Sequence, residues 1–365
     1  MEKKKVIFIC QALAIGGTER VLSILAEGIS AQGHTVKIIM TEDFPIHYNT
    51  DEKIELIKFP RLQGKGTSSL KVKLIKQILR DEKPDMVIPF AQDTNILTLL
   101  ACRKLKCKVI ISERNDPVLD PLPFKLWLMK KLLYKKADGF VFQTEAAKKF
   151  YSKLIQKKSV VIGNPILSGL PNRHDGERKK QIIGIGRLVP QKNFKLLIDA
   201  FKLFNDEIND YKLIIYGEGY LREQLQQQIN DYGLTSSVEL KPFETDNLHK
   251  KIVDSAMLVQ SSDYEGVSNV MLECMAIGLP VIVTDQTNGG PKQYIKDSEN
   301  GIIVPLKDKV AMSKAMIRLA SNKELQDKIS KNSGSIKETL SREKIFEEWG
   351  RYIGQVISGE NRKWR

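Results

Sequence analysis

The chain has 365 residues, of which 42% are hydrophobic and 28% charged, and its formal net charge is +14. This length is too great for one ordinary core and fits two domains of about 150 to 180 residues. Every apolar run falls short of the roughly 18 residues that a membrane-spanning helix needs, so we expect a globular protein that does not cross a bilayer.

The positive charge is concentrated in the first half of the chain. Residues 1–170 hold 29 Lys and Arg against 17 Asp and Glu, whereas residues 171–365 hold 29 against 27. Such an excess attracts nucleic acid, an anionic membrane surface or a phosphorylated substrate. Because the sequence has no arginine-rich recognition helix and no aromatic RNA-binding motif, we expect no nucleic-acid partner.

The first residues and the cysteines indicate a cytoplasmic protein. The start, "MEKKKVIFIC", runs directly into a glycine turn, which favours a first buried strand over a signal peptide. Cys10, Cys102, Cys107 and Cys274 have apolar neighbours and no C-x-x-C spacing. This pattern favours reduced core thiols over a zinc site or a disulfide framework.

Strand patterns alternate with helix patterns along the first half. The first helix pattern, "TERVLSILAEGISAQG", has apolar residues at helical spacing and ends at Gly33. The β-branched and aromatic runs that predict strands are 5–11, 34–40, 84–90, 107–113, 139–144 and 160–166.

The polar stretch 168–180 reads as a linker, and the alternation restarts after it. The strands predicted in the second half are 181–186, 211–217, 237–243, 256–262, 280–284 and 301–305. Apolar strands that alternate with helices indicate parallel sheets covered on both faces. The sequence therefore predicts an α/β protein of two Rossmann-like, doubly wound parallel-sheet domains that face each other across a cleft, with ligands at the carboxyl ends of the strands.

Glycine turns follow three of these strands. In "IGGTER", Gly16 and Gly17 open a helix and can bring backbone N–H groups close to a phosphate. The stretch does not match the dinucleotide fingerprint G-x-G-x-x-G, and a plain tight turn is the alternative. In "IIYGEGYLREQL", Gly217 and Gly219 again allow close backbone approach.

The third turn, "GIGRLVPQKNF", carries two cations. Arg187 lies just past a strand and Lys192 lies beside the start of the next helix. Two cations in this position can clamp a diphosphate without a metal ion. The alternative is that both side chains are simply solvated on the surface.

The stretch "SSDYEGVSNVMLECMAIGLPVIV" carries two carboxylates in a basic chain. Glu265 lies in a loop above the sheet and Glu273 lies inside the following helix. At 1.5 Å rise per residue, positions eight apart are too distant for two carboxylates that grip one glycosidic oxygen. Their acceptor oxygens suit the hydroxyl groups of one long ligand, unless both charges face water.

Together these motifs resemble the retaining, nucleotide-sugar-dependent glycosyltransferases of family four, which have the GT-B fold. The resemblance covers nearly the whole chain and rests on "IGGTERVLSILAEGI", "GRLVPQKNFKLLIDAF", "YGEGYLREQL" and "EGVSNVMLECMAIGLPVIVTD". It implies an acceptor-side domain over residues 1–170 and a nucleotide-sugar domain over residues 171–341. A C-terminal helix, 342–358, is expected to pack back on the first domain.

The resemblance also implies roles for individual residues. Arg187 and Lys192 would hold the diphosphate, Glu273 the ribose hydroxyls and Glu265 the transferred sugar. The remaining donor-binding positions would be Gly16, Gly17, Gly217, Gly219, Phe243, Gly266, Val267, Ser268 and Asn269. On the acceptor side we expect Glu113, Arg114 and Asn115, where Arg114 stands at the position of a histidine in many relatives.

The implied reaction moves a hexose or N-acetylhexosamine from a UDP-sugar to a hydroxyl, with retention and without metal or cofactor. The expected acceptor is a growing glycan linked to polyprenyl diphosphate. Two alternatives stay open: a transferase that acts on a small soluble acceptor, and a non-catalytic, sugar-binding partner subunit with the same fold.

Lysines alternate with apolar residues in two basic segments, 71–83 and 121–136. Aromatic and leucine side chains beside lysines suit the interface of an anionic membrane. The sequence therefore predicts peripheral contact with the cytoplasmic face of a membrane through Lys125, Lys130, Lys131, Lys135 and Lys136. A solvated basic helix is the alternative.

Overall fold

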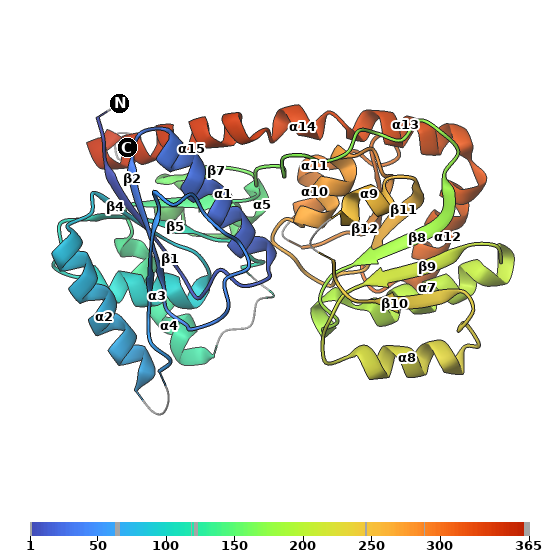
Figure 1. The fold of residues 1–365 in the computed structure, drawn as a ribbon, viewed down its shortest axis with the longest axis horizontal. Helices are drawn as coiled ribbons and strands as arrows, with labels where there is room; N and C mark the ends of the chain where they lie inside the picture. Colours follow the sequence, from blue (N-terminus) through green and yellow to red (C-terminus); the bar gives the residue numbers. More distant parts are fainter. Residues whose placement is uncertain are drawn as a thin grey trace. The chain divides into compact units, whose positions relative to one another are not determined.

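The structure is a computed structural model that describes residues 2–62, 66–117, 119, 123–244, 247–287 and 289–360. It divides into two compact units, Met1–Pro165 with Ser341–Arg365 and Ile166–Leu340. The sequence places the boundary between residues 170 and 171. Each unit contains one sheet with helices packed on it (Figure 1).

The sheet of the first unit has seven parallel strands in the order β3-β2-β1-β4-β5-β6-β7. Its strands are β1 (Lys5–Cys10), β2 (Thr35–Met40), β3 (Glu55–Lys58), β4 (Met86–Pro89), β5 (Lys108–Ser112), β6 (Gly139–Phe142) and β7 (Ser159–Val161). Strand β3 is missing from the sequence prediction. It is a short edge strand whose first and last residues are exposed, so its sequence lacks the apolar run of a buried strand.

Helices cover this sheet and supply much of its core. They are α1 (Gly17–Ala31), α2 (Thr67–Glu82), α3 (Gln92–Ala101), α4 (Phe124–Leu133), the 3-10 turn η1 (Tyr134–Lys136), α5 (Glu145–Phe150), α6 (Lys153–Gln156) and α15 (Arg342–Ser358). Ile75 and Leu79 of α2 belong to the same buried cluster as Ile7 and Ile9 of β1. Gly33, with φ of +91°, follows α1 and allows the chain to turn into β2.

The last helix, α15, belongs to the first unit and packs on α1. A Cβ atom at Gly28 of α1 would lie 2.4 Å from the Phe346 ring, so only glycine allows the two helices to come this close. At the other end of α15, the Tyr352 hydroxyl donates to the Lys158 carbonyl at 2.6 Å and accepts from the Phe140 N–H at 2.9 Å. These contacts attach a segment from the end of the chain to the sheet of the first unit.

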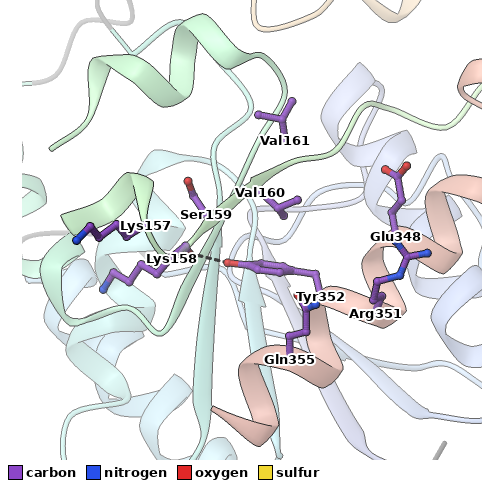
Figure 2. Close-up of a pocket in the computed structure, with 9 residues that line it drawn as sticks. All are labelled: Lys157, Lys158, Ser159, Val160, Val161, Glu348, Arg351, Tyr352 and Gln355. Atoms are coloured by element: carbon purple, nitrogen blue, oxygen red, sulfur yellow. Dashed lines mark hydrogen bonds between the residues drawn. The ribbon is translucent and has the colours of Figure 1, made fainter. Parts of the chain in front are cut away.

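The edge strand β7 and α15 border a cavity of about 430 Å³. Figure 2 shows Tyr352 pointing from α15 toward Lys158, with Glu348 and Arg351 on the same helix. The cavity is lined by charged and aliphatic side chains and lies beside the outermost strand of the sheet.

The second unit has six parallel strands in the order β10-β9-β8-β11-β12-β13. The strands are β8 (Lys179–Ile185), β9 (Lys212–Tyr216), β10 (Val238–Lys241), β11 (Ser255–Gln260), β12 (Val281–Thr284) and β13 (Ile302–Val304). The helical segments are η2 (Pro190–Lys192), α7 (Phe194–Glu207), α8 (Arg222–Asp231), α9 (Leu248–Ile252), α10 (Asn269–Ala276), α11 (Gly290–Tyr294), α12 (Lys309–Ser321), α13 (Lys323–Ser333) and α14 (Ile336–Thr339). Apolar side chains of α7, α8 and α12 form one buried cluster with the central strands.

Both parallel sheets confirm the predicted α/β class. Within the described residues, no helix is both long enough and apolar enough to span a membrane.

We expect opposite effects on stability from alanine at two glycines of the α1–α15 pair. Gly354→Ala should raise the melting temperature, because nothing lies within 4 Å of the added Cβ and alanine favours a helix by about 0.5–1 kcal/mol. Gly28→Ala should lower it, because the overlap with Phe346 costs about 1–3 kcal/mol. Thermal unfolding followed by circular dichroism measures both. A stabilised Gly28→Ala protein would contradict the close packing of these helices.

Candidate active site

The loops after β8 and β9 run side by side at the carboxyl end of the second sheet. The Leu188 N–H donates to the Glu218 carbonyl at 2.7 Å. A Cβ atom would lie 2.0 Å from the Gly186 carbonyl oxygen if Gly217 were replaced, and 2.4 Å from the Leu188 carbonyl oxygen if Gly219 were replaced. Glycine is therefore required at these two predicted donor-binding positions for a structural reason: a side chain at either position would separate the two loops.

The two cations predicted to clamp a diphosphate follow β8, and they differ in their surroundings. Arg187 is exposed, and within the described residues its guanidinium makes no hydrogen bond or ion pair. Lys192 ends η2 and forms an ion pair with Glu265, in which the two side chains are 16% and 12% exposed. One cation is thus open to solvent, whereas the other is held by a carboxylate.

Hydrogen bonds join the segment 191–193 to the turn after β11, which spans 261–265. The Ser262 hydroxyl donates to Glu265 Oε1 at 2.9 Å. The same oxygen forms the ion pair with Lys192. Three further side-chain bonds of 2.9 Å link Gln191 to the Tyr264 carbonyl, Asn193 to Asp263, and Ser261 to the Lys192 carbonyl. The structure therefore brings Lys192 and Glu265 together on a turn that is tied to the β8 loop.

The second predicted carboxylate, Glu273, lies on α10 with only 5% of its side chain exposed. Its Oε2 is 3.0 Å from Nε2 of His249, which projects from α9. Nothing in the sequence singles out His249, because it lies in a polar segment 24 residues before Glu273 and has no ligand spacing. Folding alone places the imidazole on this carboxylate.

The remaining donor-binding predictions lie on two separate elements of the second unit. Gly266, Val267 and Ser268 are buried, and the Ser268 hydroxyl caps α10 by accepting from the Met271 N–H at 3.3 Å. Asn269 is half-buried at the first position of α10, and Phe243 is half-buried two residues after β10.

Gly16 and Gly17 lie at the start of α1 in the first unit. Gly16 is the N-cap residue, with an extended backbone, and Gly17 is the first helical residue. The carboxylate of Glu19 lies over Gly16, where an added Cβ would be 2.1 Å from Oε2. An acidic side chain thus accompanies the positive end of this helix, where the sequence predicts a phosphate.

Glu113, predicted on the acceptor side, lies at the centre of a buried hydrogen-bond cluster. Tyr134 and Asn95 donate to Oε1 at 2.6 and 2.9 Å, and Tyr151 and Lys130 donate to Oε2 at 2.6 and 2.9 Å. Burial raises the pKa of Glu113, but the charge of Lys130 and the hydrogen bonds from Tyr134, Tyr151 and Lys130 outweigh it and leave the pKa lowered. The carboxylate is therefore held ionised and joins β5 to α3, α4, η1 and the segment after α5.

Arg114, the other notable acceptor-side residue, is packed between polar and aromatic groups of the first unit. Its Nη1 donates to Asn164 Oδ1 at 2.7 Å. The guanidinium carbon lies 4.5 Å from the Phe90 ring centre and 5.7 Å from that of Trp349 on α15. Neighbouring Asn115 accepts from the following backbone N–H at 3.0 Å. An arginine cannot act as a general base, so in this position it supplies a fixed positive charge.

A second cavity in the first unit, of about 550 Å³, lies at the carboxyl end of its sheet. Gln11 and Thr41, which directly follow β1 and β2, line it together with Lys71 and Arg103. Its apolar walls include residues of α2, α3 and α4, among them Val72, Ile96, Leu97, Leu100, Leu126 and Met129.

The outward face of α4 carries exposed apolar side chains. They are Phe124, Trp127, Leu128 and Leu132, and Phe124 is 74% exposed. The Phe124 and Trp127 rings stack with centres 5.9 Å apart, and the Lys131 ammonium lies 5.2 Å from the Trp127 ring centre. The prediction that Lys130 is one of the membrane-facing lysines is wrong, because this residue is buried in its ion pair with Glu113.

Comparison with known proteins matches both units to glycosyltransferase families. The family model described as Glycosyltransferase Family 4 matches residues 15–166, and the model described as Glycosyl transferases group 1 matches residues 171–335. The solved structures that resemble the chain include HepE of Anabaena in complex with UDP. It has a TM-score of 0.81 at 16% identity, with 96% of this chain and all of that chain covered.

Two curated relatives span nearly the whole chain. The first is the GalNAc-alpha-(1->4)-GalNAc-alpha-(1->3)-diNAcBac-PP-undecaprenol alpha-1,4-N-acetyl-D-galactosaminyltransferase of Campylobacter jejuni. It is 26% identical over an alignment of 363 residues that covers 96% of this chain and 99% of the relative. The second is the amylovoran biosynthesis glycosyltransferase AmsD of Erwinia amylovora, 24% identical over 92% of this chain and 95% of the relative. Because the two family models together match most of the chain and the fold agrees with theirs, the chain belongs to the GT-B glycosyltransferases of family 4.

Proposed function

We propose that this enzyme transfers a hexose or an N-acetylhexosamine from a UDP-sugar, with retention, to a hydroxyl of a glycan carried on polyprenyl diphosphate. The name of the Campylobacter relative specifies an undecaprenol-linked substrate, and that of the Erwinia relative specifies amylovoran biosynthesis. HepE was solved in complex with UDP, as was TarM of Staphylococcus aureus. These names support the class of donor and acceptor.

The observation that carries the proposal is the exposed guanidinium of Arg187 in the same segment after β8 as Lys192, which pairs with Glu265. In the transfer, the bond between the anomeric carbon and the diphosphate oxygen breaks, and negative charge accumulates on the leaving diphosphate. Fixed cations at this position stabilise that charge as it develops. We infer that Arg187 and Lys192 supply this stabilisation, and that the reaction needs no metal ion.

The ion pair also suggests how the sugar and the diphosphate share the site. A lysine ammonium has three N–H donors, so Lys192 can keep one bond to Glu265 and direct another to a phosphate oxygen. Glu265 Oε1 already accepts from Ser262 as well as from Lys192, and its remaining lone pairs can accept from sugar hydroxyls. We therefore assign Glu265 to sugar binding. Retention follows if the acceptor hydroxyl attacks from the face that the diphosphate leaves, with a leaving phosphate oxygen taking its proton.

We place the acceptor on the first unit, at the carboxyl end of its sheet. The 550 Å³ cavity there joins polar residues after β1 and β2 to apolar residues of α4. The opposite face of α4 exposes aromatic and leucine side chains beside lysines. A lipid carrier at the cytoplasmic surface of an anionic membrane fits both features, because apolar side chains enter the interface while lysines bind headgroups.

A panel of UDP-sugars tests the reaction class. Each sugar is supplied with a lipid-linked saccharide or with soluble saccharides, and UDP release and the anomeric configuration of the product are measured. We expect UDP release with a lipid-linked acceptor and a retained configuration. Release with soluble acceptors alone would favour the soluble-acceptor alternative. An inverted product would exclude the proposed mechanism.

Removal of the proposed clamp should slow transfer strongly. Arg187→Ala and Lys192→Ala should each lower kcat/KM by about 30- to 1000-fold, equivalent to about 2–4 kcal/mol of transition-state stabilisation. Lys195→Ala, which removes an exposed lysine on the neighbouring turn of α7, is the matched control and should leave turnover unchanged. Steady-state kinetics with the best donor measure all three. Unchanged turnover in the Arg187→Ala, Lys192→Ala double variant would rule out the clamp.

Neutralising the outward lysines should weaken membrane binding. Each basic residue near an anionic surface contributes about 1 kcal/mol, so replacing Lys125, Lys131, Lys135 and Lys136 by Gln should abolish salt-sensitive sedimentation with anionic vesicles. Lys130→Gln is the internal control: it should lower the melting temperature, because it leaves Glu113 buried without its cation. Wild-type protein that stays in the supernatant with anionic vesicles at low salt would contradict the membrane contact.

A further inference from the structure

The mechanism above does not use the contact between His249 and Glu273. This contact joins α9 to α10, and it involves the carboxylate that the family resemblance assigns to the ribose. His249 lies on α9 and Glu273 on α10. Their Nε2 and Oε2 atoms are 3.0 Å apart, and the two side chains are 16% and 5% exposed. A contact this well covered has a fixed geometry, unlike an ion pair between two solvated side chains.

Both partners are anchored by buried neighbours on their own helices. Leu248 and Ile252 bury α9 on either side of His249. Leu272 and Cys274 flank Glu273 and are fully buried on α10. The backbones are thus held in place, and the last side-chain torsion of Glu273 decides how the plane of its carboxylate is turned. That torsion has no sharp intrinsic preference, so a hydrogen bond is needed to set it.

We propose that His249 is a positioning residue for nucleotide recognition: with a proton on Nε2, it donates to Oε2 of Glu273 and orients the carboxylate so that its remaining lone pairs accept from the ribose hydroxyls of the donor. This inference rests on the proposed assignment of Glu273 to the ribose. An ionised carboxylate offers about four acceptor positions, and the bond from the imidazole occupies only one of them. The imidazole itself need not touch the nucleotide.

The role predicts a specific loss. Without the imidazole, the carboxylate loses one of the hydrogen bonds that orient it, and the hydrogen bonds to the ribose should weaken while contacts to the diphosphate and the base persist. The affinity for a nucleotide that has ribose hydroxyls should therefore fall. The affinity for a nucleotide that lacks them should not change. A purely structural role of His249 would weaken every ligand alike.

Calorimetric titration with UDP and with 2′,3′-dideoxy-UDP tests this. Wild type should prefer UDP, and His249→Ala should weaken UDP binding on the order of tenfold, the size of one hydrogen bond to a charged group, with little change for the dideoxy analogue. His249→Gln, which keeps an N–H donor, should restore much of the preference. With the best donor, His249→Ala should raise KM and leave kcat nearly unchanged.

Two controls separate the possible failures. Lys250→Ala removes the exposed neighbour on α9 and should change neither titration, and the melting temperature of each variant reports on folding. If wild type and Glu273→Ala bind both nucleotides equally well, the ribose assignment fails and the inference fails with it. If wild type prefers UDP and His249→Ala keeps the full preference, or loses affinity equally for both nucleotides, only the positioning role is overturned.

Discussion

In each unit every strand runs parallel to its neighbours, and this single constraint decides where chemistry can occur. Parallel strands bring all their carboxyl ends to one edge, where the following loops must fit side by side. In the second unit the loops after β8 and β9 lie so close that Gly217 has no space for a side chain. The same edge carries Arg187 and Lys192 from the segment after β8, and Glu265 from a turn 73 positions beyond Lys192.

The balance of charge at this edge is as important as its shape. A carboxylate that is almost buried needs a partner, because the loss of hydration is otherwise too costly. Glu265 has Lys192 and the Ser262 hydroxyl, and Glu273 has His249. Arg187 remains exposed and carries a positive charge that an anionic ligand can neutralise. This edge of the sheet thus holds both carboxylates in fixed pairings and leaves the Arg187 guanidinium open to solvent.

A comparable pairing organises the first unit. Lys130 turns inward to Glu113, where two tyrosines and an asparagine complete the acceptor positions of the carboxylate. On the inner face of α4 this lysine lies among Leu126, Met129 and Leu133, whereas the opposite face exposes Phe124, Trp127 and their neighbours. An ordinary surface helix has a polar outer face, so the exposed aromatic and leucine side chains of α4 are unusual.

The sequence by itself determined the alternation of strands and helices, because buried parallel strands are continuous apolar runs that stand out between helical patterns. It also placed Arg187 and Glu265 in loops and Glu273 on a helix, because glycine turns and caps are local signals. The exposed edge strand β3 escaped detection, since nothing local distinguishes it from a loop. The tertiary structure alone decided which groups meet: the Lys192–Glu265 pair, the imidazole on Glu273 and the inward turn of Lys130. Such contacts join residues 17 to 73 positions apart, and periodicity and spacing carry no information about partners at those separations.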